Sequence, residues 1–263
     1  MEAMIFAAGK GRRLRPLTDT TPKALIDFGG VPLVERVAGN LVAAGAHRVI
    51  VNAHHLAHQV AEWAAASPLG VPVVVSREDE VSPAPLDTSG GLFHAGPLFE
   101  AEAPFLLHNC DVATAVDLAA LYHAHVEGEA RDGRLATLVV AERATTRPLL
   151  LDGDGVVGRA NHTEGWEVIA RPPSPGGETR EYGFCGIHVL SERVFERSAE
   201  GGTFSIMDSY MDWIGDGERV GVFDATGTPW YDIGTPERLA AARRAFAAGS
   251  ATGATPSGGS AGA

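Results

Sequence analysis

Cations and glycines are concentrated in the segment "AAGKGRRLRPLTDTTPK", residues 7–23. Five of the 21 basic residues lie within the first 23 positions, and these five include both lysines, Lys10 and Lys23. Glycines let backbone N–H groups approach a phosphate closely, and cations add charge-assisted hydrogen bonds. Lysine carries a compact charge on a flexible stem, whereas the guanidinium group of arginine is a planar fork. Because both lysines lie in this segment, we infer that it needs an ammonium group that can extend to a ligand. The segment predicts a local phosphate-binding site, and a solvated basic loop is the plainer interpretation.

The glycine spacing distinguishes this segment from two common nucleotide-binding motifs. The dinucleotide fingerprint GxGxxG would need glycine at the position of Leu14, and the P-loop pattern GxxxxGK[ST] does not occur in the chain. A dinucleotide-dependent oxidoreductase is therefore disfavoured.

Two aspartates follow apolar segments in the way that metal ligands of α/β proteins often do. Asp111 comes after "PFLLHN", and Asp232 ends "PWYD". Side chains at the carboxyl ends of strands can meet in one crevice, and magnesium prefers oxygen ligands. For either aspartate alone, a helix N-cap or a turn is an equally good interpretation.

The elements that must position these residues alternate between apolar segments and amphipathic ones. The expected strands cover residues 2–7, 47–53, 71–76 and 104–109, and the expected helices cover 32–45, 55–66 and 115–126. Parallel neighbours need a helical crossover, so this alternation predicts a mostly parallel sheet with helices on both faces.

The pattern changes near residue 134. Strand-like segments at 134–142, 148–158 and 182–190, with a Gly-Asp-Gly turn in the second, predict an antiparallel excursion. Helical patterns return at 204–215 and 235–249, where Thr235 is the expected N-cap. We expect a single domain over residues 1–248, with 1–133 mainly binding nucleotide and 134–248 mainly binding the second substrate. The small, polar residues 249–263 are expected to form a disordered tail.

Composition and charge exclude several classes of function. A chain of 263 residues that is 45% hydrophobic can bury a core, and its net charge of −12 argues against a general nucleic-acid or anionic-membrane surface. The sequence has neither an apolar run of the ~20 residues that span a membrane nor a signal peptide, so we expect a cytoplasmic protein. Cys110 and Cys185 lie far apart, and we expect reduced thiols. A monomer or a homodimer is expected.

With "PLT" at residues 16–18 and "PK" at 22–23 added, the amino-terminal segment resembles the signature of sugar-1-phosphate nucleotidylyltransferases, GxGxRLxPLT followed by PK. The later segments "GGVPLVERV", "VNAHHLAHQV", "LDTSGGL", "FLLHNCD" and "WYDIGTPERL" agree in order. Among the members, the chain looks most like short bacterial ones that include N-acetylmuramate-1-phosphate uridylyltransferases and mannose-1-phosphate guanylyltransferases. The resemblance implies an α/β fold, a Rossmann-like mixed sheet sandwiched by helices.

The resemblance also implies a reaction. A sugar 1-phosphate oxygen attacks the α-phosphorus of a nucleoside triphosphate, UTP or GTP, and pyrophosphate leaves. Both substrates are polyanions, so catalysis should rest on cations and Mg²⁺. In the family, the equivalents of Arg13, Lys23 and Asp111 act in catalysis, and Asp111 and Asp232 hold the metal. The implied nucleotide-binding residues are Ala8, Gly9, Gly11, Arg12, Arg13, Lys23, Asn52, Glu78, Thr88 and Gly90.

The acceptor side departs from the family pattern. Asn109, Arg143, Asn161, Glu181 and Gly186 are the expected sugar-phosphate residues, but the Glu-Lys-Pro element of many larger relatives, whose lysine grips the sugar phosphate, is missing. Arg147, Arg159 and Arg171 are further candidates to replace that lysine. Many relatives have Gly or Ser at the position of Cys110. We interpret Cys110 as a larger side chain that the surrounding packing tolerates. A non-catalytic nucleotide-sugar sensor on the same fold stays open as an alternative, because a fold does not prove turnover.

Overall fold

The computed structural model describes residues 1–197 and 203–251, with side chains up to Phe246. Of the predicted disordered tail, residues 252–263 lie outside the described residues, and residues 249–251 belong to the last helix, α6.

The first half of the chain forms a parallel sheet with helical crossovers, as the alternating pattern predicts. Its strands lie in the order β3-β2-β1-β4, and all three pairings are parallel. The strands are β1 (Glu2–Phe6), β2 (Arg48–Ala53), β3 (Val73–Arg77) and β4 (Phe105–Asn109), and the helices are α1 (Leu33–Ala43), α2 (Ala57–Ala65), α3 (Asp87–Ala95) and α4 (Leu118–Asp132).

The second half extends the same sheet with antiparallel strands. Strand β10 runs antiparallel to β4, β6 and β7, which makes the ten-stranded sheet mixed. The remaining elements are β6 (Ala136–Ala141), β7 (Leu149–Asp152), β8 (Gly155–Asn161), β9 (Trp166–Ile169), β10 (Arg180–Leu190), β11 (Val220–Asp224), α5 (Ile206–Gly215) and α6 (Pro236–Ala251). A separate antiparallel ribbon pairs β5 (Val112–Thr114) with β12 (Trp230–Asp232).

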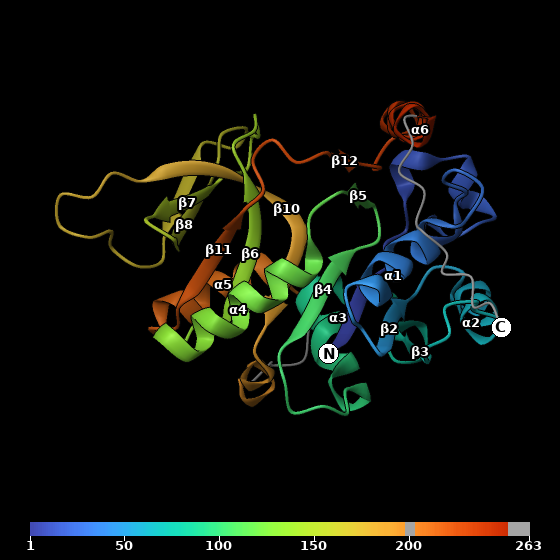
Figure 1. Ribbon diagram of the computed structural model, residues 1–263, viewed down its shortest axis with the longest axis horizontal. Coiled ribbons are helices and arrows are strands. Elements are labelled where there is room, and N and C mark those ends of the chain that lie inside the picture. The colour runs from blue at the N-terminus through green and yellow to red at the C-terminus, as the bar shows by residue number, and fades with distance from the viewer. Residues whose placement is uncertain (198–202, 252–263) are drawn as a thin grey trace, which may run out of the picture.

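The core has two layers because successive strand residues point to opposite faces of the sheet. Ala3 and Ile5 of β1 join a cluster that includes buried residues of α1, α2 and α4, whereas Met4 between them joins the cluster that includes α3 and α5. Figure 1 shows α1 and α4 in front of the sheet and α3 and α5 behind it. The expected Rossmann-like sandwich is confirmed.

A third, smaller core connects the amino-terminal segment to the last helix. Leu14, Phe28 and Leu33 pack with Ile233 of the segment after β12 and with Leu239 of α6. In Figure 1, α6 lies over the blue amino-terminal segment. Burying a leucine or phenylalanine side chain stabilises a fold by ~1.5–3 kcal/mol, so this core holds the cation-rich segment against the β5–β12 ribbon.

The segment "LDTSGG" is largely helical, although none of the expected helices includes it. Helix α3 begins at Asp87 and includes Gly90 and Gly91. Glycine disfavours a helix interior by ~1 kcal/mol, which hides the helix from a propensity argument. Tertiary packing overrides that preference, because a Cβ at Gly91 would lie 2.6 Å from the side chains of both Asn52 and Glu78.

Candidate active site

Three strand ends form the base of the site. Phe6, the last residue of β1, is paired in register with Asn52 on β2 and with Asn109 on β4. Open α/β sheets bind ligands at the carboxyl ends of their strands. A cavity of about 350 Å³ lies at this edge. Its lining consists of Phe6, Ala7, Ala8, Gly9, Lys23, Asn52, Pro85, Asp87, Thr88, Asn109, Cys110, Asp111 and Thr203.

The glycine-rich loop after β1 is held to this edge by hydrogen bonds. The Asn52 side-chain oxygen accepts from the backbone N–H groups of Ala7 at 2.6 Å and Ala8 at 3.3 Å. Gly11 has a φ of +58°, and a Cβ there would lie 2.8 Å from Cγ2 of Thr18. Thr18 donates its hydroxyl to the Gly11 carbonyl at 2.9 Å, so the loop folds back on itself and only glycine suits this position.

Lys23 and Asp111 meet in the cavity. The ammonium group of Lys23 donates to Oδ2 of Asp111, and the exposed fractions of their side chains are 11% and 28%. The N-cap interpretation of Asp111 does not hold, because Asp117 caps α4 by accepting from the Ala120 N–H at 2.9 Å. The Asp111 carboxylate therefore lines the cavity together with a cation.

The β5–β12 ribbon brings the backbone of the second aspartate next to that of Asp111, but Asp232 is not among the residues that line the cavity. The Ile233 N–H donates to the Asp111 carbonyl at 2.8 Å, and Asp232 pairs in register with Val112. Asp232 forms an ion pair with Arg238. Thr235 accepts from the Arg238 N–H at 3.3 Å, so the expected N-cap of the last helix is confirmed and Asp232 is not needed there.

Arg13 reaches the end of this ribbon from the amino-terminal segment. A Cβ at Gly234 would lie 2.7 Å from Oδ1 of Asp232 and 2.8 Å from Nη2 of Arg13. Among the described residues, no group of three or more His, Cys, Asp or Glu side chains could hold a metal ion. Two carboxylates fit magnesium nevertheless, because Mg²⁺ is commonly bound by one or two carboxylates together with substrate phosphates and water.

The remaining predicted nucleotide-binding residues differ in their surroundings. Thr88 lines the cavity, and its hydroxyl accepts from the Ile206 N–H at 2.8 Å. Gly90 is buried in α3, whereas Arg12 is exposed on the helical turn after Gly11. Glu78 is fully buried, and burial raises the pKa of its carboxyl group, an effect opposed by hydrogen bonds from Leu86 and Asn52.

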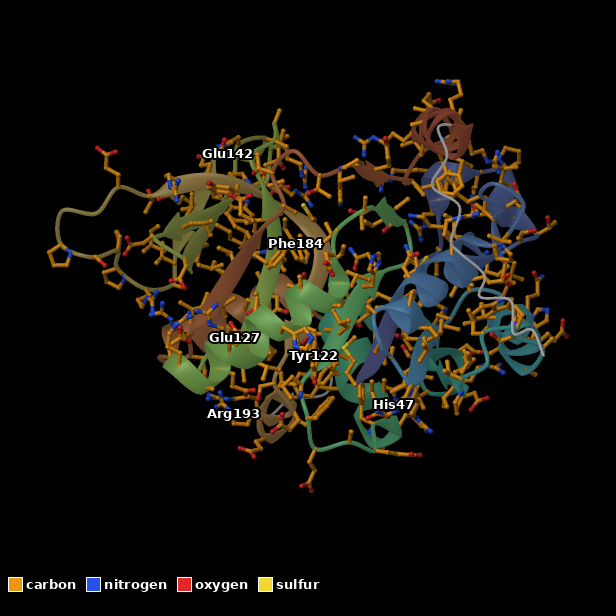
Figure 2. All side chains as sticks on the ribbon, in the orientation of Figure 1. His47, Tyr122, Glu127, Glu142, Phe184 and Arg193 are labelled. Atoms are coloured by element: carbon orange, nitrogen blue, oxygen red, sulfur yellow. The ribbon has the colours of Figure 1, made fainter. Side chains whose placement is uncertain are left out.

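A second cavity of about 410 Å³ opens on the antiparallel half. Its lining consists of Arg143, Thr145, Arg147, Leu149, Arg159, Ala160, Asn161, Glu164, Trp166, Phe184, Ser205 and Met207. Arg143 lies 4.4 Å from the centre of the Trp230 ring and donates to the Phe184 carbonyl at 2.5 Å. Figure 2 labels Phe184 on β10, where this strand passes β6. The ring of His188 lies 5.2 Å from that of Phe184 and 6.1 Å from that of Phe6, which lines the first cavity, so His188 stands between the two cavities.

Asn109 and Gly186 are brought together. Gly186 has a φ of +74° within the irregular part of β10, and a Cβ there would lie 2.8 Å from the side-chain nitrogen of Asn109. The other two predicted sugar-phosphate residues, Asn161 and Glu181, are not part of this contact. Asn161 is buried and accepts from two backbone N–H groups of the following turn, and Glu181 is exposed beside His162 at 3.1 Å.

Sequence reasoning missed several residues that line or shape the first cavity. Pro85, Asp87 and Thr203 line it, and Gly91 lets α3 approach the Asn52–Glu78 pair. Two adjacent glycines are compatible with close packing, but nothing in the sequence pattern shows which of the two is required. Cys110 is buried, and burial raises the pKa of its thiol to about 12, which agrees with the interpretation of packing. Both cysteines are free, as expected.

Comparison with known proteins agrees with the fold and shows the family. The nucleotidyl transferase family profile matches residues 2–249. N-acetylmuramate alpha-1-phosphate uridylyltransferase of Neisseria meningitidis is 32% identical over 91% of this chain and 95% of its own length. Mannose-1-phosphate guanylyltransferase of Mycobacterium tuberculosis is 30% identical over 90% of this chain and 62% of its own length. The inositol-1-phosphate CTP transferase of T. maritima has the same fold, with a TM-score of 0.69 at 21% identity over 92% of this chain and 96% of that one.

The fold and the site thus define a nucleotidyltransferase. The chain belongs to the nucleotidyl transferase family, and its relatives are sugar-1-phosphate uridylyl- and guanylyltransferases, so it is an enzyme of this type. None of the described helices is long and apolar enough to cross a membrane.

Proposed function

We propose that the protein transfers a nucleotidyl group from UTP or GTP to a sugar 1-phosphate and releases pyrophosphate. The observation that carries this proposal is the meeting of Lys23 and Asp111 in a cavity at the strand ends. Two relatives that the chain spans over nearly their full length are named uridylyltransferases, which makes UTP the first nucleotide to test.

The nucleoside triphosphate is assigned to the first cavity, between the loop of residues 7–11 and the wall that contains Thr88. Lys23 neutralises phosphate charge where the new bond forms, and Arg13 binds the departing pyrophosphate. Both roles need cations held in place before the reaction, because aligned charges stabilise a transition state without reorganisation. Attack by the acceptor oxygen in line with the leaving group then depends chiefly on positioning.

Asp111 and Asp232 are proposed to hold Mg²⁺. When bound, the ion would supply positive charge that cancels part of the repulsion between the two polyanions. Lys23 forms an ion pair with Asp111, and Arg238 forms one with Asp232.

The sugar 1-phosphate is assigned to the second cavity. Arg143 is the proposed replacement for the missing lysine, since it lies against Trp230, two residues before Asp232. Asn109 and Gly186 are proposed to line the path between the cavities. Asn161 and Glu181 stay as proposals for sugar hydroxyl contacts, with Asn161 the better placed because it lines the second cavity. The proposed division of labour is therefore nucleotide on residues 1–133 and acceptor on residues 134–248.

A pyrophosphate-release screen tests this function. UTP, GTP, CTP, ATP and dTTP are each combined with the 1-phosphates of N-acetylmuramate, mannose, glucose and heptose in the presence of Mg²⁺. We expect release with UTP or GTP and one acceptor, and no release without the acceptor. If the protein binds nucleotide but releases no pyrophosphate in any of these combinations, a sensor is favoured instead.

A further inference from the structure

Asn52 and Glu78 form a buried hydrogen-bonded pair beneath the first cavity. Asn52 is 2% exposed and Glu78 is 0% exposed, and the Asn52 side-chain nitrogen donates to Oε1 of Glu78 at 2.6 Å. The Asn52 oxygen accepts from the N–H groups of Ala7 and Ala8. Both ends of the Asn52 side chain are therefore bonded within the protein.

The second oxygen of Glu78 holds the opposite wall of the cavity. Oε2 accepts from the Leu86 N–H at 2.9 Å. The next residue, Asp87, lines the cavity with a φ of +61°, in the left-handed region that few residues other than glycine adopt. The glycine-rich loop and the segment that begins α3 are thus connected through one pair of side chains.

Gly91 makes room for this pair. Any larger residue would place its Cβ 2.6 Å from the Asn52 nitrogen and from Oε1 of Glu78. Burying a carboxylate is costly unless it is hydrogen-bonded, and apolar side chains of similar volume often stabilise a core as well as a polar pair does. Filling the core would not require a buried polar pair at this position. Holding two loops at a fixed spacing does require it, because the pair bonds to backbone N–H groups of both loops.

We propose that Asn52 and Glu78 are positioning residues that set the spacing between the two loops around the nucleoside triphosphate. They act through the N–H groups of Ala7, Ala8 and Leu86 and not by contact with the base. This inference rests on the proposed function, because it assumes that the first cavity binds the nucleotide.

An exchange of the two functional groups tests this inference. Asn52→Asp puts two carboxylates in contact, and Glu78→Gln leaves one donor facing another donor. In the double variant, the introduced amide can donate to the introduced carboxylate and still accept from Leu86, while that carboxylate still accepts from Ala7 and Ala8. The pair is then restored with its polarity reversed. We measure the Kd of UTP and of GTP by calorimetry without acceptor, and KM and kcat by pyrophosphate release.

Each single variant should raise the Kd and KM of the nucleotide by about tenfold or more with little change in kcat, and the double variant should recover most of the loss. Single variants that bind UTP and GTP like the wild type would overturn the inference. So would a double variant as weak as the sum of the singles, because a direct base contact is not restored by reversing donor and acceptor. If the unchanged protein binds no nucleotide, the proposed function itself fails.

A second variant keeps the test valid if the single variants do not fold. Gly91→Ala inserts a methyl group against the pair without altering its chemistry. Gly39→Ala in α1 is the matched control, because the nearest atom to its Cβ lies 4.0 Å away. Gly91→Ala should weaken nucleotide binding and Gly39→Ala should not. Equal nucleotide affinity in these two variants would contradict the positioning role.

Discussion

Lys23 and Asp111, separated by 88 positions in the sequence, form an ion pair inside the cavity at the strand ends. This pair joins the cation-rich segment to the aspartate that follows β4. The second aspartate, Asp232, reaches the same edge through the β5–β12 ribbon.

Replacing Lys23 by Arg should reduce kcat/KM by about 100-fold or more, because a planar fork cannot occupy the place of a compact ammonium group. Steady-state pyrophosphate release measures the effect. Arg15→Lys is the matched control, since Arg15 is 65% exposed and paired with Asp19 on the surface. A loss for Lys23→Arg no larger than for the control would show that the lysine is kept there by chance.

Removing the charge of either aspartate of the proposed magnesium site should abolish turnover without unfolding the protein. For Asp111→Asn and Asp232→Asn we expect a loss of about 1,000-fold or more in kcat, because neither amide can replace an anionic magnesium ligand. Asp117→Asn is the control, since asparagine also caps helices well. Circular dichroism checks the fold, and near-normal turnover in either test variant would refute the metal assignment.

Arg143→Gln should raise the KM of the sugar 1-phosphate by about tenfold, because the variant loses one charge-assisted hydrogen bond to the phosphate. The KM of the nucleotide should stay unchanged. Arg159→Gln should have a smaller effect, because its guanidinium group already pairs with Asp208. A larger effect at Arg159 would move the acceptor phosphate to the other side of the second cavity.

Stability should fall as the pH is lowered from 7 towards 5. Burial, together with the nearby His108, lowers the pKa of His188 to about 3, and burial and neighbouring arginines lower the pKa of His125 to about 4. In the unfolded chain these histidines take up protons near pH 6.5, so each costs the folded state up to about 1.4 kcal/mol per pH unit below that value. Denaturant unfolding at several pH values measures this slope.

The variant His188→Gln removes one of these groups and should flatten the dependence on pH. His188 is hydrogen-bonded to Tyr210 at 2.5 Å, so the variant is also expected to be less stable at neutral pH. An unchanged slope in His188→Gln would mean that other groups cause the acid sensitivity.

Much of the fold was predictable because periodicity reports burial directly. The predicted strands and helices of the parallel half lie close to their observed bounds, except that α4 continues to Asp132, beyond the predicted end at residue 126. The Gly-Asp-Gly turn connects β7 to β8 as expected. Strand β9 was not predicted, because its exposed residues Trp166, Val168 and Ile169 carry no alternation of buried and polar positions. Helix α3 was hidden by two glycines, of which Gly91 is required by its packing against Asn52 and Glu78.

A sequence motif can indicate residues that line a cavity. It cannot indicate residues whose role depends on tertiary packing alone. Lys23, Asp111 and Thr88, to which the family resemblance assigns roles in the site, line the first cavity. Those roles stay predictions. Glu78 illustrates the limit. Its position after a strand pointed to the nucleotide pocket, but only the coordinates place its two oxygens on Asn52 and Leu86. Spacing along a chain does not reveal which buried polar groups bond to one another.

The most direct measurement follows the whole reaction by ³¹P NMR in one mixture of protein, nucleoside triphosphate, sugar 1-phosphate and Mg²⁺. The account predicts that the triphosphate signals give way to pyrophosphate and to the diphosphate of a nucleotide sugar in equal amounts. The reaction should stop when EDTA is added, and it should not start with Asp111→Asn. The same products at an undiminished rate in EDTA, or with both aspartates replaced by asparagine, would contradict the claim that these carboxylates and a divalent ion bring two polyanions together.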